Sequence, residues 1–311
     1  MNRKGIRTHL KSKIDSWLAS IEDETVRKLA ARNTIVTGGA IASMLLGEKI
    51  NDYDLYFRDQ ATAYAVARYY IKRFKPASRK GIACAISVIS ETDRVKIVIQ
   101  SAGIASETGD KPYEYFEARP ENEAEAFVGE VLQDAGTIEE TCEETEQASL
   151  DTGEKEKDYR PIFMSTNAIT LSGRVQVILR FFGEPDEIHK NYDFVHCTNY
   201  WDAHDGELTL RPAALEALLT KELIYVGSKY PVCSLFRLRK FIRRGWKINA
   251  GQILKAVMQI NELDLTNIEV LQDQLTGVDC AYFMEVVNKL KQADPVKVNA
   301  AYLVEIIDRM F

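Results

Sequence analysis

Two acidic residues and two glycines lie close together in the first part of the chain. Asp52 and Asp54 are one residue apart, and twelve residues separate Asp52 from the pair Gly38 and Gly39. In an extended strand alternate side chains share a face, so the two carboxylates would point the same way, about 7 Å apart. Such carboxylates repel unless a cation lies between them, and hard oxygen ligands suit Mg²⁺. The spacing predicts a Mg²⁺ or Mn²⁺ site.

The glycine pair could hold a phosphate group beside that metal. Glycine lets the backbone approach a ligand closely, and the start of the following helix offers N–H groups to an anion. The local pattern is a β-prone run at Ile35–Thr37, a helix at Ala40–Leu46, and a strand whose Tyr53, Leu55 and Phe57 point into the fold. A phosphate cradle next to a metal pair suggests nucleotidyl transfer. The alternative is a turn followed by a solvated strand edge.

A second group of residues offers positive charge to a triphosphate. Arg180 stands near the end of a predicted strand, and Asp193 follows it. Arg239 and Arg243 are four apart on a basic helix and therefore share a face. The guanidinium fork of arginine suits phosphate oxygens. We expect these arginines to form a cationic wall, although they could instead stay solvated on the helix surface.

These residues carry a resemblance to a known group of enzymes. Gly38-Gly39, twelve residues, and then Asp52-Tyr53-Asp54-Leu55 is similar to the signature of the DNA polymerase β-like nucleotidyltransferase superfamily. Leu45-Leu46-Gly47 resembles the class II tRNA nucleotidyltransferase and bacterial poly(A) polymerase branch, and there is a weaker similarity to nucleotidyltransferase-like proteins of tailed phages. The resemblance covers roughly residues 34–100 and 162–249. It implies an NTP substrate, Mg²⁺ or Mn²⁺, and an RNA 3′ end as the acceptor.

The same branch has counterparts for the second group. Arg180 resembles its strand arginine, Asp193 the acid of an Arg-Arg-Asp-Phe segment, and Arg239 and Arg243 the arginines of its last helix. By this resemblance Gly38, Gly39, Ser43, Arg180, Asp193, Arg239 and Arg243 bind the nucleotide.

The departures from that branch concern its charged residues. Ala42-Ser43 stands where it has Arg-Asp, Cys197 replaces an asparagine, and the base-reading Glu-Asp-x-x-Arg motif is absent. Gln176 occupies the strand position where a third carboxylate is expected, which leaves Asp193 or Glu91 as substitutes. A catalytically silent protein with the same fold and a binding or virion-assembly role is therefore the alternative function.

The predicted fold is α+β, with a mixed sheet flanked by helices. Residues 1–116 and 161–249 form a nucleotidyltransferase-like head, in which Ile162–Leu171 is read as one strand and Ile82–Ile89 pairs with Arg94–Gln100 as a hairpin. Residues 117–160 hold fifteen acidic and four basic residues, a net charge of −11 within a chain of net charge −6. Low hydrophobicity with high charge predicts a flexible insertion.

Residues 250–311 are expected to form a C-terminal helical domain that could bind a protein partner. No run of eighteen apolar residues occurs, so no membrane contact is expected. The five scattered cysteines favour free thiols in a reducing compartment. The expected location is the cytoplasm, or the virion under the alternative function.

Overall fold

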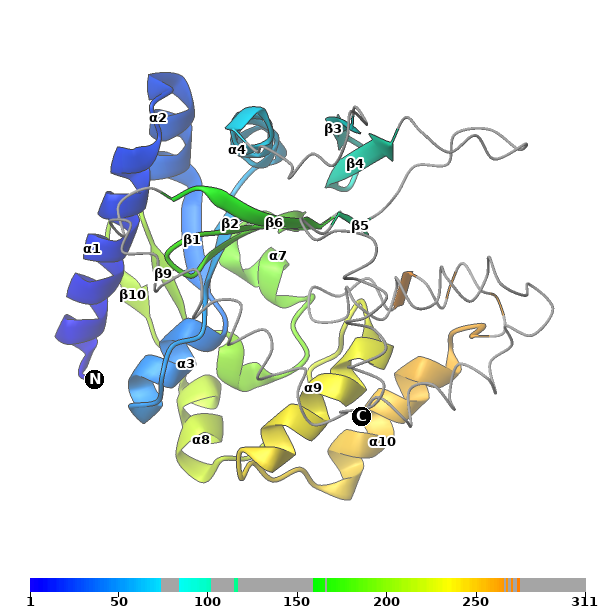
Figure 1. The fold of residues 1–311 in the computed structure, drawn as a ribbon. Helices are drawn as coiled ribbons and strands as arrows, with labels where there is room; N and C mark the ends of the chain where they lie inside the picture. The colour runs from blue at the N-terminus through cyan, green and yellow to red at the C-terminus, as the bar shows by residue number, and fades with distance from the viewer. Residues whose placement is uncertain are drawn as a thin grey trace, which may run out of the picture.

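The computed structural model describes residues 1–73, 84–101, 115–116, 159–165 and 167–265, together with residues 267, 270, 273 and 274. The helices of these residues lie around a central sheet (Figure 1). In chain order they are α1 (Arg3–Ser20), α2 (Glu24–Asn33), α3 (Gly39–Leu46), α4 (Gln60–Arg73), α7 (Pro185–His189), the 3₁₀ turn η1 (Val195–Cys197), α8 (Pro212–Thr220), α9 (Pro231–Arg243) and α10 (Ala250–Asn261).

The central sheet of the described residues has eight strands in the order β10-β9-β1-β2-β8-β7-β6-β5. Its pairs are antiparallel except for β2 and β8, which are parallel, so the predicted mixed sheet flanked by helices is confirmed. The strands are β1 (Thr34–Thr37), β2 (Tyr53–Phe57), β5 (Tyr115–Phe116), β6 (Pro161–Ser165), β7 (Ala168–Leu171), β8 (Val175–Phe182), β9 (Tyr200–Asp202) and β10 (Leu208–Thr209), with β3 (Cys84–Ser90) and β4 (Val95–Ser101) in a separate antiparallel pair.

Alternation along β2 separates the main core from the face that carries the acidic residues. Leu55 and Phe57 are completely buried and Tyr53 nearly so, within a cluster that includes the apolar stripe of α1. Burial of each such side chain stabilises the fold by about 2 kcal/mol. Asp54 and Tyr56 point to the opposite face, as the period of two requires. The predicted inward direction of Tyr53, Leu55 and Phe57 is therefore confirmed.

Helices cover both faces of the sheet. Figure 1 shows α4 with the β3–β4 pair on one side, and α7 to α10 on the other. A second apolar cluster joins Ala42 of α3 and Phe194 to Trp246, behind the acidic face. This cluster fixes α3 and η1 against the segment that follows α9.

One predicted strand is wrong. The segment Ile162–Leu171 is two strands, β6 and β7, which pair antiparallel as a hairpin. The chain reverses at Asn167, which is buried and whose backbone oxygen accepts a hydrogen bond from the N–H of Leu179 at 2.8 Å. Both halves are apolar, so the sequence pattern did not reveal the reversal. The predicted hairpin of β3 and β4 is confirmed.

Much of the predicted insertion and of the C-terminal domain lies outside the described residues. Of residues 117–160 only 159 and 160 are described, and most residues after 265 are not. Where α10 is described, it is tied to the head: the hydroxyl of Tyr225 donates to Oε1 of Gln259 at 2.5 Å, and Nε2 of Gln259 donates to the Ser228 carbonyl at 2.6 Å.

Candidate active site

The turn at Gly38 brings strand β1, helix α3 and the Asp54 carboxylate together. Gly38 has φ 93° and caps α3, and its N–H donates to the carbonyl of Cys197 at 3.1 Å. A Cβ atom at Gly38 would lie 2.8 Å from Oδ2 of Asp54 and 3.6 Å from the hydroxyl of Tyr192. A side chain here would therefore occupy the space of the carboxylate. Gly39 has an open side, since a Cβ there would meet nothing within 4 Å.

The sheet register places the acidic pair at this turn. Thr37, the last residue of β1, is opposite Asp54, and Gln176 of β8 is opposite Asp54 on the other side. Asp52 comes just before β2, and both acids are half-buried. The structure thus brings Asp54 to the turn at Gly38, as the sequence predicted. Gln176 lies where a third carboxylate would be, and its neutral amide supplies no charge.

A third carboxylate reaches the same place from the segment after α7. Burial raises the pKa of the Cys197 thiol to about 12, and the next causes are the negative charges of Asp193 and Asp54, with a smaller contribution from Asp52. Arg237 acts in the opposite direction. The segment that carries Asp193 also contacts the turn directly, because the Cys197 carbonyl accepts the hydrogen bond from the Gly38 N–H. Of the two substitutes expected for the third carboxylate, Asp193 is in this group. Glu91 lies in the β3–β4 turn.

An ion pair within this group joins Asp193 to helix α9. Nη1 of Arg237 is 2.5 Å from Oδ2 of Asp193. Only 6 % of the Asp193 side chain is exposed, against 28 % of the Arg237 side chain. The second oxygen of Asp193, Oδ1, is buried without a hydrogen-bond partner among the described residues. Arg237 thus provides positive charge directly beside the carboxylates.

The pKa values of two tyrosines are raised at this face of the sheet. Burial raises the pKa of Tyr56 far above its usual value, and the charge of Asp54 adds to the effect. Burial likewise raises the pKa of Tyr192, with further contributions from Tyr56 and Asp54. Their rings lie 6.0 Å apart. Both phenols therefore remain protonated and form an apolar wall with polar ends beside Asp54.

The other predicted cationic residues lie elsewhere. Arg180 is buried, and its Nε donates to the hydroxyl of Tyr230 at 3.0 Å while Nη1 is 3.4 Å from Oδ2 of Asp93. Arg180 therefore connects β8 to the start of α9 and to the β3–β4 turn. Arg239 and Arg243 are about 200° and 240° around the helix from Arg237, at about 100° per residue. They face away from Asp193.

Sequence reasoning missed Arg237, although it lies within the basic helix that was singled out. The resemblance to the nucleotidyltransferase branch indicated Arg239 and Arg243 instead. No local sequence signal distinguishes Arg237, because its position depends on a tertiary contact: Phe241, four residues later, packs on Phe194 with ring centroids 5.7 Å apart. The predicted nucleotide residue Ser43 lies in the second turn of α3, where its carbonyl accepts hydrogen bonds from Gly47 and Glu48.

The acidic residues near the turn have the chemistry of metal ligands, but they do not form a complete metal site. Asp52, Asp54 and Asp193 with Arg237 have a net charge of −2, and their oxygens are the hard ligands that Mg²⁺ and Mn²⁺ prefer. The buried, unpartnered Oδ1 of Asp193 is the kind of atom that a cation or its water would satisfy. Within the described residues no three acidic, cysteine or histidine groups converge closely enough to bind a metal by themselves. Substrate oxygens would have to complete the shell.

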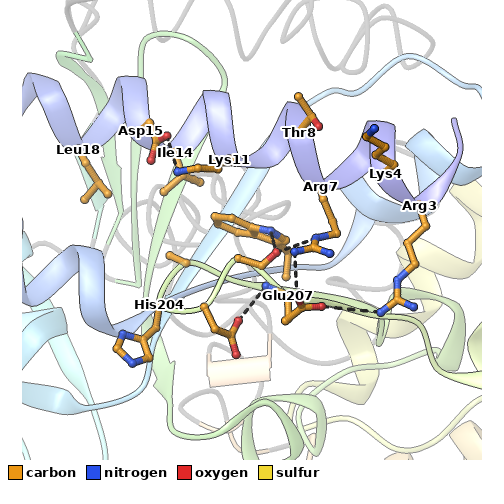
Figure 2. Close-up of a pocket in the computed structure, with 14 residues that line it drawn as sticks. Arg3, Lys4, Arg7, Thr8, Lys11, Ile14, Asp15, Leu18, His204 and Glu207 are labelled. Carbon is orange, nitrogen blue, oxygen red and sulfur yellow. Dashed lines mark hydrogen bonds and ion pairs between the residues drawn. The ribbon is translucent and has the colours of Figure 1, made fainter.

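A separate hollow lies between α1 and the β9–β10 turn (Figure 2). It has a volume of about 940 Å³, and basic residues of α1 line one side. Arg7 is 2.8 Å from Glu207 and also donates to the carbonyl of Gly206, and Lys11 is 2.9 Å from Asp15. Arg7 thus connects α1 to the turn, whereas the pair of Lys11 and Asp15 lies within α1; the hollow contains no part of the acidic pair.

Comparisons with known proteins found a family match over most of the chain and a relative encoded by a phage. A sequence profile described as "Gad2: Gabija anti-defense 2 family protein" matches residues 8–221. The protein Gabija anti-defense 2 of Bacillus phage SPbetaL7 is 24% identical over 107 residues, which are 34% of this chain and 27% of that protein. The match thus spans about a quarter of that relative's length. Its source agrees with the expected similarity to phage-encoded proteins.

Two solved structures are similar to the chain at low sequence identity. The CCA-adding enzyme of Bacillus stearothermophilus in complex with CTP is 13% identical, with a TM-score of 0.37 over 86% of this chain and 49% of that one. The CCA-adding enzyme of Thermotoga maritima complexed with tRNA is 12% identical, with a TM-score of 0.38 over 87% of this chain and 52% of that one. The chain spans about half the length of these enzymes.

No helix in the described ranges is both long and apolar enough to cross a bilayer.

Proposed function

The chain belongs to the Gabija anti-defense 2 family, and from this membership we propose that it counteracts the Gabija defence by nucleotidyl transfer. In this reaction a nucleoside monophosphate moves from an NTP to a hydroxyl acceptor, and pyrophosphate is released. The observation that carries the proposal is the contact of the Asp54 carboxylate with the Gly38 turn at the start of α3. The start of α3, whose N–H groups could bind an anion, and the Asp54 carboxylate, which could bind a metal ion, therefore lie at the same turn.

Each part of this site has a chemical task in the proposal. Asp52 and Asp54 would hold a Mg²⁺ or Mn²⁺ ion, which supplies neutralising charge to the phosphates and lowers the pKa of the attacking hydroxyl. The first N–H groups of α3 have no partner within the helix and can donate to a phosphate oxygen. Gly38 has no side chain to cap them. The chain thereby positions an anionic substrate beside its acidic pair without a clash.

The proposed acceptor is an RNA 3′ end, on the strength of the family resemblance. The test incubates the purified protein with each α-labelled NTP, Mg²⁺ or Mn²⁺, and bulk RNA, and with a cell extract as a source of protein acceptors. Label should enter RNA with the wild type and be lost in the Asp52→Asn/Asp54→Asn variant. The matched control is Asp15→Asn, which removes an exposed acid paired with Lys11 on α1. Label on protein instead would refute the RNA acceptor but not the reaction.

A second candidate is a binding protein that has lost the chemistry. The observation in its favour is Ala42, which is buried in the apolar cluster of Phe194 and Trp246 where the resembling enzymes have an arginine. The two candidates differ in bacteria that carry the Gabija defence. If transfer is the function, wild-type protein restores phage plating and Asp52→Asn/Asp54→Asn does not. Equal restoration by both proteins, without any label transfer, would favour the binding protein.

A further inference from the structure

The ion pair between Arg237 and Asp193 holds a cation on the segment that borders the Gly38 turn. Only 6 % of the Asp193 side chain is exposed to solvent, whereas 28 % of the Arg237 side chain is exposed. A buried carboxylate therefore holds an arginine whose side chain is partly exposed to solvent. Nη1 of Arg237 donates to Oδ2 of Asp193 at 2.5 Å, a charge-assisted hydrogen bond of the kind that arginine also makes with phosphate oxygens.

The surroundings of Arg237 identify what it could bind. The segment that carries Asp193 borders the Gly38 turn on both sides of that residue. The Tyr192 hydroxyl would lie 3.6 Å from a Cβ at Gly38, and the Cys197 carbonyl accepts a hydrogen bond from the Gly38 N–H at 3.1 Å. Through Asp193, Arg237 is thus held on the segment that borders this turn, where Oδ2 of Asp54 also lies. A polyphosphate on that ion would bring negative charge within reach of the guanidinium. By contrast, the ion pair with Asp93 holds Arg180 at the β3–β4 turn.

We propose that Arg237 is the residue that binds the polyphosphate of the nucleotide, and that Asp193 positions it. This inference rests on the proposed function and extends it, because it assigns the phosphate-binding cation to a residue outside the motif that resembles the enzymes. Asp193 fixes one edge of the guanidinium, so less side-chain freedom is lost when the substrate binds. The arginine wall predicted at Arg239 and Arg243 is replaced by one arginine on the opposite face of the same helix.

A test must separate phosphate binding from a structural role. Arg237→Gln alone would leave Asp193 buried and unpaired, which can unfold the protein. The comparison therefore uses Asp193→Asn as the background, in which no buried carboxylate needs the arginine. Isothermal titration with magnesium tripolyphosphate is measured for Asp193→Asn, for Asp193→Asn/Arg237→Gln, and for Asp193→Asn/Arg244→Gln. The last is the matched control, because it removes an exposed arginine seven residues further along, at the end of α9.

The expected result is binding by Asp193→Asn that weakens about tenfold or more when Arg237 is also replaced, since a charge-assisted hydrogen bond to phosphate is lost. The Arg244→Gln control should stay within about twofold. Equal binding by the first two variants, or no binding by Asp193→Asn and wild type, would overturn the inference. Tripolyphosphate binding needs no transfer. Binding through Arg237 without label transfer would refute the proposed reaction and leave the inference intact, and transfer without an effect of Arg237 would do the reverse.

Discussion

The adjacent glycines Gly38 and Gly39 permit a paired substitution with opposite expected results. Gly38 has φ 93° and ψ −149°, close to the region that only glycine occupies comfortably, and its added Cβ would be 2.8 Å from Oδ2 of Asp54. Gly39 has no unusual φ and no neighbour within 4 Å of an added Cβ. We expect Gly38→Ala to lower the free energy of unfolding by about 1–3 kcal/mol from backbone strain. Displacement of the carboxylate adds about 1 kcal/mol to this loss.

Gly39→Ala should be neutral or stabilise the protein by up to about 1 kcal/mol, because alanine favours the helix more than glycine. The assay is urea unfolding followed by circular dichroism for both variants and the wild type. An Asp54→Ala background separates the two contributions: there Gly38→Ala should lose only the strain, so its effect falls by about 1 kcal/mol. Equal stabilities of the two alanine variants would refute the geometry of this turn.

Three further outcomes follow from the described contacts. Burial lowers the pKa of His196 and of His189 to about 4, so the unfolded chain binds two protons below about pH 6.5 that the folded chain does not bind; each histidine should reduce folding stability by about 2 kcal/mol from pH 7.5 to 5, and His196→Phe should remove about half of the combined loss in denaturant titrations at both pH values. Arg58→Ala should cost about 1–3 kcal/mol in the same titration, because it leaves Asp202, with 10 % of its side chain exposed, without its partner at 2.6 Å; a cost below 0.5 kcal/mol would contradict this. Iodoacetamide at pH 8 should alkylate Cys197 at least about a thousandfold more slowly in the folded than in the unfolded protein, as followed by peptide mass spectrometry, because its pKa of about 12 leaves little thiolate.

The parts of the fold that could be predicted depend on short-range patterns. The period of two at Tyr53, Leu55 and Phe57 defines one buried face of a strand wherever that strand lies in the sheet. Gly38 could be identified because a strand that turns directly into a helix often needs a positive φ. Both features are local, so one segment contains all the information. The local pattern did not predict the hairpin within Ile162–Leu171, because two short apolar strands have the same composition as one long strand.

The ion pair between Arg237 and Asp193 could not be predicted from local sequence patterns. Arg237 and Asp193 are 44 residues apart, and their contact depends on how α9 is rotated when it packs on Phe194. Every arginine on that helix has the same local sequence signal, so only tertiary packing selects one. The nucleotide-binding role of Arg180 stays a prediction; within the fold its guanidinium contacts Tyr230 and Asp93, which no local pattern indicated.

The central claim is that Asp52 and Asp54 hold a divalent ion together with a nucleotide at the Gly38 turn. The most direct test is a crystal structure with Mn²⁺ and a non-hydrolysable NTP, in which anomalous scattering locates the metal. We expect a peak about 2.0–2.2 Å from carboxylate oxygens of both aspartates, with the polyphosphate between it and the start of α3. A peak elsewhere, or a nucleotide bound in the hollow beside α1 with this turn empty, would contradict the account.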